Sequence, residues 1–149
     1  MKLGQHLIAT GSTTQIPISL SSGEAEFYAM VKGASEMLGL TSIAKDLNVD
    51  LLGQIHSDSS AAIGIVHRRG LGKVKHMHTQ YLWVQERVRS KDFSLHKIRT
   101  DDNTADLMTK YLIRVKIDLC MKNISQEVRQ GRATSGLDVQ CAQAKKTEV

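Results

Sequence analysis

The stretch SLSSGEAEFYAM (residues 19–30) passes from an extended-type pattern to a helical one, and it carries two acids, Glu24 and Glu26, separated by one residue. Ser21 and Glu24 have the S-x-x-E spacing of a capping box, in which the two side chains satisfy backbone groups at a helix start. This spacing gives Glu24 a structural role. Glu26 has no such role, and its plain alternative is a solvated acid near the positive end of the helix dipole, worth less than about 1 kcal/mol.

The residues that follow predict a long helix from residue 24 to about residue 47. Apolar side chains recur along it at helical spacing and form a wide stripe, which favours packing against a large surface such as a sheet. The stripe consists of Phe27, Met30, Val31, Ala34, Met37, Leu38, Leu40, Ala44 and Leu47.

Four segments around this helix have strand-like patterns. Residues 6–12 (HLIATGS) and 15–21 (QIPISLS) predict a hairpin, and Pro17 would place its second strand at a sheet edge because proline cannot donate to the ladder. Residues 53–58 (GQIHSD) and 93–100 (FSLHKIRT) predict two further strands.

The remaining patterns are helical. A helix capped by Ser59 or Ser60 follows the third strand, a long helix is expected at about residues 74–90, and DDNTADLMTKYL (residues 101–112) opens another. The order β-β-α-β-α-α-β-α predicts an α/β domain with a mixed sheet flanked by helices, over residues 1–112. We expect residues 113–149 to form a poorly ordered extension, because no periodic pattern is sustained there.

Composition limits the classes of protein that fit. The 149 residues suffice for one domain with a core, and 20 Lys and Arg against 15 Asp and Glu give a net charge of +5 that suits a polyanionic partner. The two cysteines lack CxxC spacing, which favours a reducing compartment. No secretory h-region or membrane-length apolar run is present. We expect an intracellular protein, cytoplasmic or nuclear, with no membrane partner.

Two more acids stand at junctions between predicted elements. Asp58 ends an apolar strand, where open α/β sheets bind ligands; it could equally cap the next helix, although Ser59 and Ser60 can do so instead. Asp106 follows Asn103 in an N-x-x-D arrangement, so a capping role is the stronger expectation for it alone.

Taken together, Glu26, Asp58 and Asp106 suggest a site for hard divalent cations such as Mg²⁺, which prefer oxygen ligands. Two such ions, about 3.5–4 Å apart, would stabilise the attacking and leaving oxygens of a phosphodiester cleavage. This hypothesis requires that all three carboxylates lie close together.

The densest basic run is formed by Arg68, Arg69, Lys73 and Lys75, with glycines between them and His76 directly after. Cations on a glycine-rich loop suit contact with a phosphate backbone, while a solvated basic loop is an equally weighted alternative.

Four separated motifs carry a resemblance to a known family. SLSSGEAEFYAM, IHSDSSAAIGI, KHMHTQYLWVQERV and DNTADLMTKYL have the order and spacing of the ribonuclease H region that closes the Pol polyprotein of copia-type retrotransposons. The resemblance spans roughly residues 4–112.

The resemblance implies a fold and a chemistry. The family's domain is similar to type 1 ribonuclease H, which cleaves the RNA strand of an RNA–DNA hybrid with two Mg²⁺ (or Mn²⁺) ions held by four carboxylates. By motif position, Glu26 matches the helix glutamate, Asp58 the acid that closes the fourth strand, and Asp106 the acid of the last helix. Glu24 would cap the helix, and Arg68, Arg69, Lys73, Lys75 and His76 would contact the nucleic acid.

The chain departs from the family at its start. The family's first acid lies in an opening strand upstream of the hairpin, and this strand is central in the sheet. The sequence begins inside the second strand, so one metal ligand and the central strand are expected to be missing. We therefore leave open whether this chain is an enzyme, and we expect little or no nuclease activity from it alone.

Three interpretations follow. The leading one is a fragment of a retrotransposon ribonuclease H domain, with an RNA–DNA hybrid or other nucleic acid and the upstream reverse transcriptase part of the polyprotein as partners. The alternatives are a catalytically silent nucleic-acid-binding module and a decayed transposon remnant that folds poorly.

Overall fold

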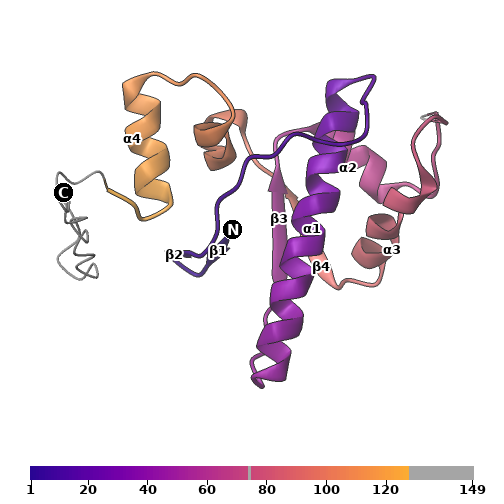
Figure 1. Cartoon of the computed structure of the whole chain (residues 1–149), viewed down its shortest axis with the longest axis horizontal. Coiled ribbons are helices and arrows are strands. Elements are labelled where there is room, and N and C mark those ends of the chain that lie inside the picture. The colour runs from indigo at the N-terminus through magenta and orange to yellow at the C-terminus, as the bar shows by residue number, and fades with distance from the viewer. Residues whose placement is uncertain (74, 128–149) are drawn as a thin grey trace, which may run out of the picture.

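The computed structural model describes residues 1–73 and 75–127, and over these ranges the chain is of the α/β class, as predicted. Figure 1 shows the elements in order along the chain. They are β1 (Lys2–Leu3), β2 (His6–Leu7), α1 (Ser22–Asp46), β3 (Gly53–Ser57), α2 (Ser60–His67), the 3₁₀ turn η1 (Thr79–Tyr81), α3 (Trp83–Arg89), β4 (Phe93–Lys97), the 3₁₀ turns η2 (Thr100–Asp102) and η3 (Thr104–Met108), and α4 (Arg114–Asn123).

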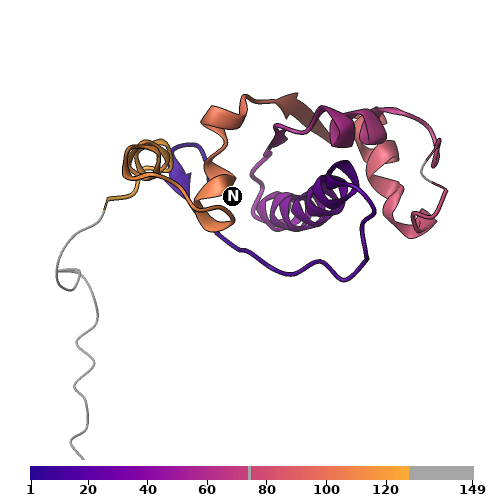
Figure 2. The ribbon, with the colours of Figure 1, turned by 90° about the horizontal axis from the view of Figure 1, so that it is seen from above.

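The strands form two separate two-stranded sheets in the described part of the chain, whereas the sequence predicted one mixed sheet. β3 and β4 are parallel, with Gly53 opposite Phe93 and Ser57 opposite Lys97. β1 and β2 pair antiparallel over two residues each. Viewed from above, α1 lies along one side of the β3–β4 pair, and the chain before α1 runs on the other side of that helix (Figure 2).

The predicted hairpin of residues 6–12 and 15–21 is wrong. Of these residues only His6 and Leu7 are in a strand, and they pair with Lys2 and Leu3. The segment that follows is irregular and crosses the outer side of α1, where the Lys32 ammonium donates to the Thr13 hydroxyl oxygen at 2.5 Å. Ile16, Ile18 and Leu20 are exposed, so the apolar side chains of this stretch have no packed face against which a second strand would be stabilised.

The long helix is confirmed as α1, which begins after Ser21 as its N-cap. The Glu24 N–H donates to Ser21 Oγ at 3.2 Å, as a capping box requires. Gly23 allows a close approach to α2, because a Cβ at this position would lie 2.8 Å from the Ala61 Cβ. The start of α1 is thus held directly beside the element that follows β3.

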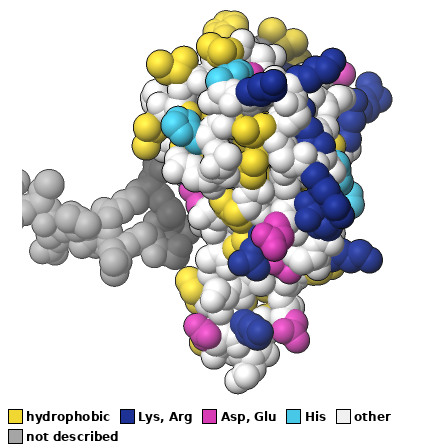
Figure 3. All heavy atoms as spheres, turned by 90° about the vertical axis from the view of Figure 1, so that its right-hand side faces the viewer, with side chains coloured by type: hydrophobic (Ala, Val, Ile, Leu, Met, Phe, Trp, Pro, Cys, Tyr) yellow, Lys and Arg dark blue, Asp and Glu magenta, His cyan; other side chains and the backbone are white. Residues whose placement is uncertain are grey.

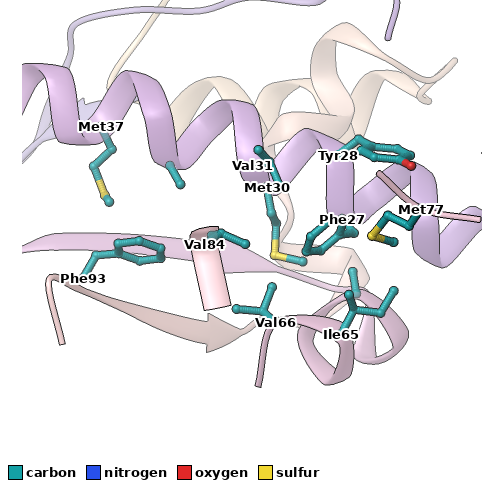
Figure 4. Packing of buried hydrophobic residues seen from close by; sticks show 12 residues of the cluster. Phe27, Tyr28, Met30, Val31, Met37, Ile65, Val66, Met77, Val84 and Phe93 are labelled. Carbon is teal, nitrogen blue, oxygen red and sulfur yellow. The ribbon is translucent and has the colours of Figure 1, made fainter. Parts of the chain in front are cut away.

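The core lies between the inner face of α1 and the layer of β3, β4, α2 and α3 (Figure 4). Phe27 is fully buried at its centre, and complete burial of such a side chain contributes about 1.5–3 kcal/mol. Aliphatic and Met side chains fill most of the rest. The buried members are Phe27, Tyr28, Met30, Val31, Ala34, Met37, Ala62, Ile65, Val66, Met77, Val84 and Phe93.

The helix predicted at residues 74–90 is shorter in the structure. Regular helix begins only at Trp83, after the η1 turn, and Val74 lies outside the described residues. Met77 is buried in the core and His76 contacts the start of α1, so tertiary contacts hold these residues in an irregular turn.

The C-terminal part also differs from the sequence prediction. Residues 101–112 form the 3₁₀ turns η2 and η3 instead of an α-helix, and α4 forms at residues 114–123, inside the segment expected to be poorly ordered. Residues 128–149 of that segment lie outside the described residues, so the division at residue 112 stays a prediction. None of the helices described here is long and apolar enough to cross a membrane.

Candidate functional site

Glu24 ties the start of α1 to two other parts of the chain. Its Oε2 accepts from the Leu20 N–H at 2.9 Å and lies 2.8 Å from His76 Nε2. In a capping box the glutamate would accept from the N–H of the N-cap residue, here Ser21. Glu24 instead accepts from the N–H of Leu20, one residue earlier. The side chain is buried, and the hydrogen bond from His76 is the main cause of a lowered pKa for the Glu24 carboxyl, against the opposing effect of burial.

Glu26 faces a different environment. Two residues along a helix correspond to a rotation of about 200°, so Glu24 and Glu26 point to nearly opposite sides of α1. The pKa of Glu26 is raised, first by desolvation and then by the charges of Asp58 and Asp106, while Lys110 opposes the rise. Since the Glu26 side chain is exposed, water screens much of this repulsion.

Asp58 stands directly after β3 and is half-buried. It does not cap α2, because Ser59 holds that position and its Oγ accepts from the Ala62 N–H at 3.2 Å. Asp58 therefore has no capping role at the start of α2.

Asp106 lies in η3 and is buried, with 9% of its side chain exposed. Asn103 caps this turn, and its Oδ1 accepts from the Ala105 N–H at 3.1 Å. The Asp106 Oδ1 is 2.9 Å from the Lys110 Nζ. The acid thus has an ion-pair partner that the N-x-x-D pattern did not predict.

The three acids therefore come from α1, the end of β3 and η3. The charges of Asp58 and Asp106 both raise the pKa of Glu26. Within the described ranges, no group of three or more His, Cys, Asp or Glu side chains is arranged closely enough to hold a metal ion. The donor set is of the oxygen type that suits Mg²⁺ or Mn²⁺, so the chemistry fits such an ion although the ligands are not drawn together.

The predicted basic residues follow α2. Arg69, Lys73 and Lys75 are exposed. Lys and Arg side chains gather along one side of the face seen in Figure 3. His76 belongs to this loop and also contacts Glu24, so the loop reaches the start of α1 on the side away from Glu26.

Arg68 differs from its neighbours in the loop. Its guanidinium packs against Gly72, where an added Cβ would lie 3.0 Å from Nη1, and Gly72 has a φ of +57°. The buried Nε and Nη2 of Arg68 have no hydrogen-bond partner. Its charge is partly enclosed by the loop, whereas the other cations of the run are free to meet a ligand.

Gln85 hydrogen-bonds to the basic loop that follows α2, and the sequence did not predict this role. This buried side chain of α3 donates to Ile65 O at 2.8 Å and to Gly70 O at 3.1 Å, and it accepts from the Gly70 N–H at 2.9 Å. The sequence carries no clear signal for this role, because Gln85 is followed in α3 by the charged residues Glu86 and Arg87. Lys110 was also missed, although its spacing of four residues from Asp106 favours an ion pair.

Comparison with curated proteins relates the chain to retrotransposon polyproteins. It is 30% identical over 115 residues to the retrovirus-related Pol polyprotein from transposon TNT 1-94 of Nicotiana tabacum, covering 76% of this chain and 9% of that protein. It is 28% identical over 133 residues to the Pol polyprotein from transposon RE2 of Arabidopsis thaliana, covering 85% of this chain and 9% of that protein. The match to transposon RE1 of the same plant is 29% over 119 residues, covering 75% and 8%.

The chain thus spans about a tenth of the length of these relatives and is similar to a segment of retrotransposon Pol polyproteins. This confirms the broader part of the resemblance drawn from the motifs. No family model and no solved structure matches the chain.

Proposed function

We propose that the chain is part of a retrotransposon ribonuclease H domain, whose complete form cleaves the RNA strand of RNA–DNA hybrids. The observation that carries the proposal is the similarity of about three quarters or more of the chain to retrotransposon Pol polyproteins, taken with the four sequence motifs of the ribonuclease H region. The charges of Asp58 and Asp106 add to the raised pKa of the Glu26 carboxyl, whose first cause is desolvation. Asp58 lies at the carboxyl end of a parallel strand, which is the edge of α/β sheets where ligands bind.

Glu26, Asp58 and Asp106 are the residues that would hold Mg²⁺ or Mn²⁺. A bound ion would neutralise charge at the phosphate and lower the pKa of bound water. The protein's own contribution would be to bring together carboxylates from α1, the end of β3 and η3. Exposed Glu26 and half-buried Asp58 would have to move toward buried Asp106 to complete the ligand set, because no such group is close enough among the described residues.

The basic loop would contact the nucleic-acid backbone. Glu24 and Glu26 point to opposite sides of α1. The basic loop, held by His76, therefore lies on one side of the first turn of this helix, and Glu26 lies on the other. A duplex lying across that turn would meet cations on one side and carboxylates on the other. Recognition would rest on shape and 2′-hydroxyls, with little reading of bases.

The isolated chain is expected to be inactive. Among the described residues, β3 is paired on only one side and no group of three acids is close enough to hold a metal ion. A silent nucleic-acid-binding module remains the second candidate, and the absence of a drawn-together ligand group among the described residues favours it.

The experiment is a binding assay by fluorescence anisotropy with an RNA–DNA hybrid, in Mg²⁺ and in EDTA, combined with a cleavage assay. The proposal predicts tighter binding in Mg²⁺, loss of this difference in Asp58→Asn, and no cleavage. The matched control is Asp46→Asn. It removes the same charge about 30 Å from Glu26 along α1, and it should leave the Mg²⁺ effect intact.

Three outcomes would contradict parts of this proposal. Affinity that is the same in EDTA and Mg²⁺ would leave only the silent module. Absence of hybrid binding would remove both candidates. Robust cleavage that Asp58→Asn abolishes would show that the expectation of inactivity is wrong.

A further inference from the structure

A pocket opens between the segment before α1, the start of α1 and the η1 turn. Its volume is about 420 Å³, which lies in the range of pockets that enclose one small molecule. Tyr28 lines it and follows Glu24 by four residues, so both side chains point to the side of α1 that the basic loop reaches. The pocket is therefore separate from Glu26, which points to the other side of the helix.

Part of the lining is aromatic. The ring centroids of Tyr28 and Tyr81 are 5.0 Å apart with 74° between the rings, and the His78 ring lies 6.4 Å from Tyr81 at 84°. Because neighbouring rings are nearly perpendicular, a flat ligand that stacks on one of them meets the edge of another, and aromatic groups prefer both arrangements. Tyr28 is buried at the edge of the core, so the fold holds this part of the lining in place (Figure 4).

The rest of the lining is aliphatic or polar. Ile16 and Ile18 are 96% and 85% exposed, with Pro17 between them, so the rim of the pocket consists of apolar side chains that face water. A flat ligand in the pocket would cover these side chains as well as the rings. Gln80 adds an exposed amide, which can both donate to and accept from the polar edge of such a ligand.

Positive charge adjoins the pocket. His76 lines it, and exposed Lys73 and Lys75 belong to the same loop, with Lys75 directly before His76. None of the described residues that line the pocket is acidic. The ligand that suits these surroundings has a flat ring for the pocket and a negative charge beside it for the lysines, and a nucleotide within a flexible strand has both.

We propose that this pocket binds an unpaired base of single-stranded nucleic acid, while Lys73 and Lys75 contact the phosphates of the same strand. Proteins that bind single strands combine cations along the backbone with aromatic side chains on which the bases stack. A duplex keeps its bases paired and stacked on one another, so the pocket favours a single strand. The inference shares the basic loop with the proposed function, but it requires neither a metal ion nor the three acids.

The test is fluorescence anisotropy in EDTA with two labelled strands of about 12 nucleotides. One is an oligothymidylate, and the other is an abasic strand that keeps the phosphates and lacks the bases. The variants are Tyr81→Leu, which removes a ring but keeps an apolar side chain, and His78→Ala, which removes an exposed ring. The matched control is His67→Ala, because this exposed imidazole at the end of α2 stands beside the basic loop but does not line the pocket.

The inference predicts that the unmodified chain binds the oligothymidylate about fivefold or more tightly than the abasic strand. Tyr81→Leu should lower the affinity for the oligothymidylate about fivefold and His78→Ala about threefold, and neither should change the affinity for the abasic strand. His67→Ala should match the unmodified chain on both strands. Lys75→Gln should weaken the binding of both strands equally, and this effect should shrink as the salt concentration rises.

Each other outcome overturns the inference. Equal affinity of the unmodified chain for the two strands would show that only phosphates are held. Unchanged oligothymidylate binding by folded Tyr81→Leu would remove the base from the pocket, and if circular dichroism shows that this variant does not fold, His78→Ala decides in its place. Self-association that Ile18→Ser abolishes, without strand binding, would assign the pocket to a second copy of the chain. Absence of strand binding would leave the proposed function to its own test, which uses the hybrid and Mg²⁺.

Discussion

Glu24 and Glu26 are the same amino acid two positions apart, yet their replacement by glutamine should change stability in opposite directions. Glu24 is buried and accepts from the Leu20 N–H and from His76, whereas Glu26 is exposed and repelled by two acids. Glutamine has nearly the same shape as glutamate, so the change tests the charge alone.

The magnitudes follow from the contacts. Hydrogen bonds to a charged group contribute about 1.5–3 kcal/mol each, and a glutamine oxygen retains part of both at position 24. His76 is 42% exposed, which weakens its share. We therefore expect Glu24→Gln to lower the free energy of unfolding by about 1.5–2 kcal/mol. Glu26→Gln should raise it by about 0.5 kcal/mol or less, because water screens the repulsion.

The assay is urea unfolding in EDTA, followed by the fluorescence of Trp83, the single tryptophan. With a slope of about 1–3 kcal/mol/M, Glu24→Gln should move the midpoint down by about 1 M, and Glu26→Gln should move it slightly up. Glu36→Gln, on the exposed face of α1, is the control and should have almost no effect. Midpoints that move in the same direction for positions 24 and 26 would refute the division of roles.

Three further predictions concern the same helix. Gly23→Ala should destabilise the chain by about 1–3 kcal/mol through its approach to Ala61, whereas Gly33→Ala, with open space around it, should stabilise by about 0.5–1 kcal/mol, as thermal unfolding of the two variants will show. Phe27→Ala should lower the free energy of unfolding by about 3–5 kcal/mol, because the ring is fully buried; a loss below 1 kcal/mol in urea would contradict the packing. The folded-state pKa of Glu24 lies below its ordinary value of 4.5, so its stabilising effect is present above that pH and is lost as the pH falls through the folded pKa; acid titration of Glu24→Gln should show a smaller loss of stability than the parent chain.

Local signals predicted the elements whose determinants lie within a few residues. The S-x-x-E spacing and the wide apolar stripe fix the start and face of α1. The alternating patterns of β3 and β4 were identified for the same reason, since Ile55 and Leu95 turn one face of the pair toward the core while the other face is exposed.

The failures arise where distant contacts decide. The alternation in residues 6–21 predicted a hairpin, but its apolar side chains Ile16, Ile18 and Leu20 find no face to pack against in the described structure. The apolar spacing at residues 74–90 suggested one helix, but the contact of His76 with Glu24 and the burial of Met77 hold a turn instead.

The candidate site divides in the same way. That Glu24 caps could be predicted from spacing, and the structure confirms the bond to Ser21. The electrostatic contact of Glu26 with Asp58 and Asp106 was a hypothesis that periodicity cannot supply, because the residues lie on three separate elements. For the ion pair of Lys110 with Asp106, the sequence offers only their spacing of four residues, which did not suffice to predict it.

The most direct test of the account is Mn²⁺ titration of the ¹⁵N-labelled chain, observed as paramagnetic loss of amide signals. We expect the signals of Glu26, Asp58 and Asp106 to lose intensity together at the lowest Mn²⁺ concentrations, well before that of Asp46 at the far end of α1. Loss at only one of the three acids, or equal loss at Asp46, would contradict a shared cation site.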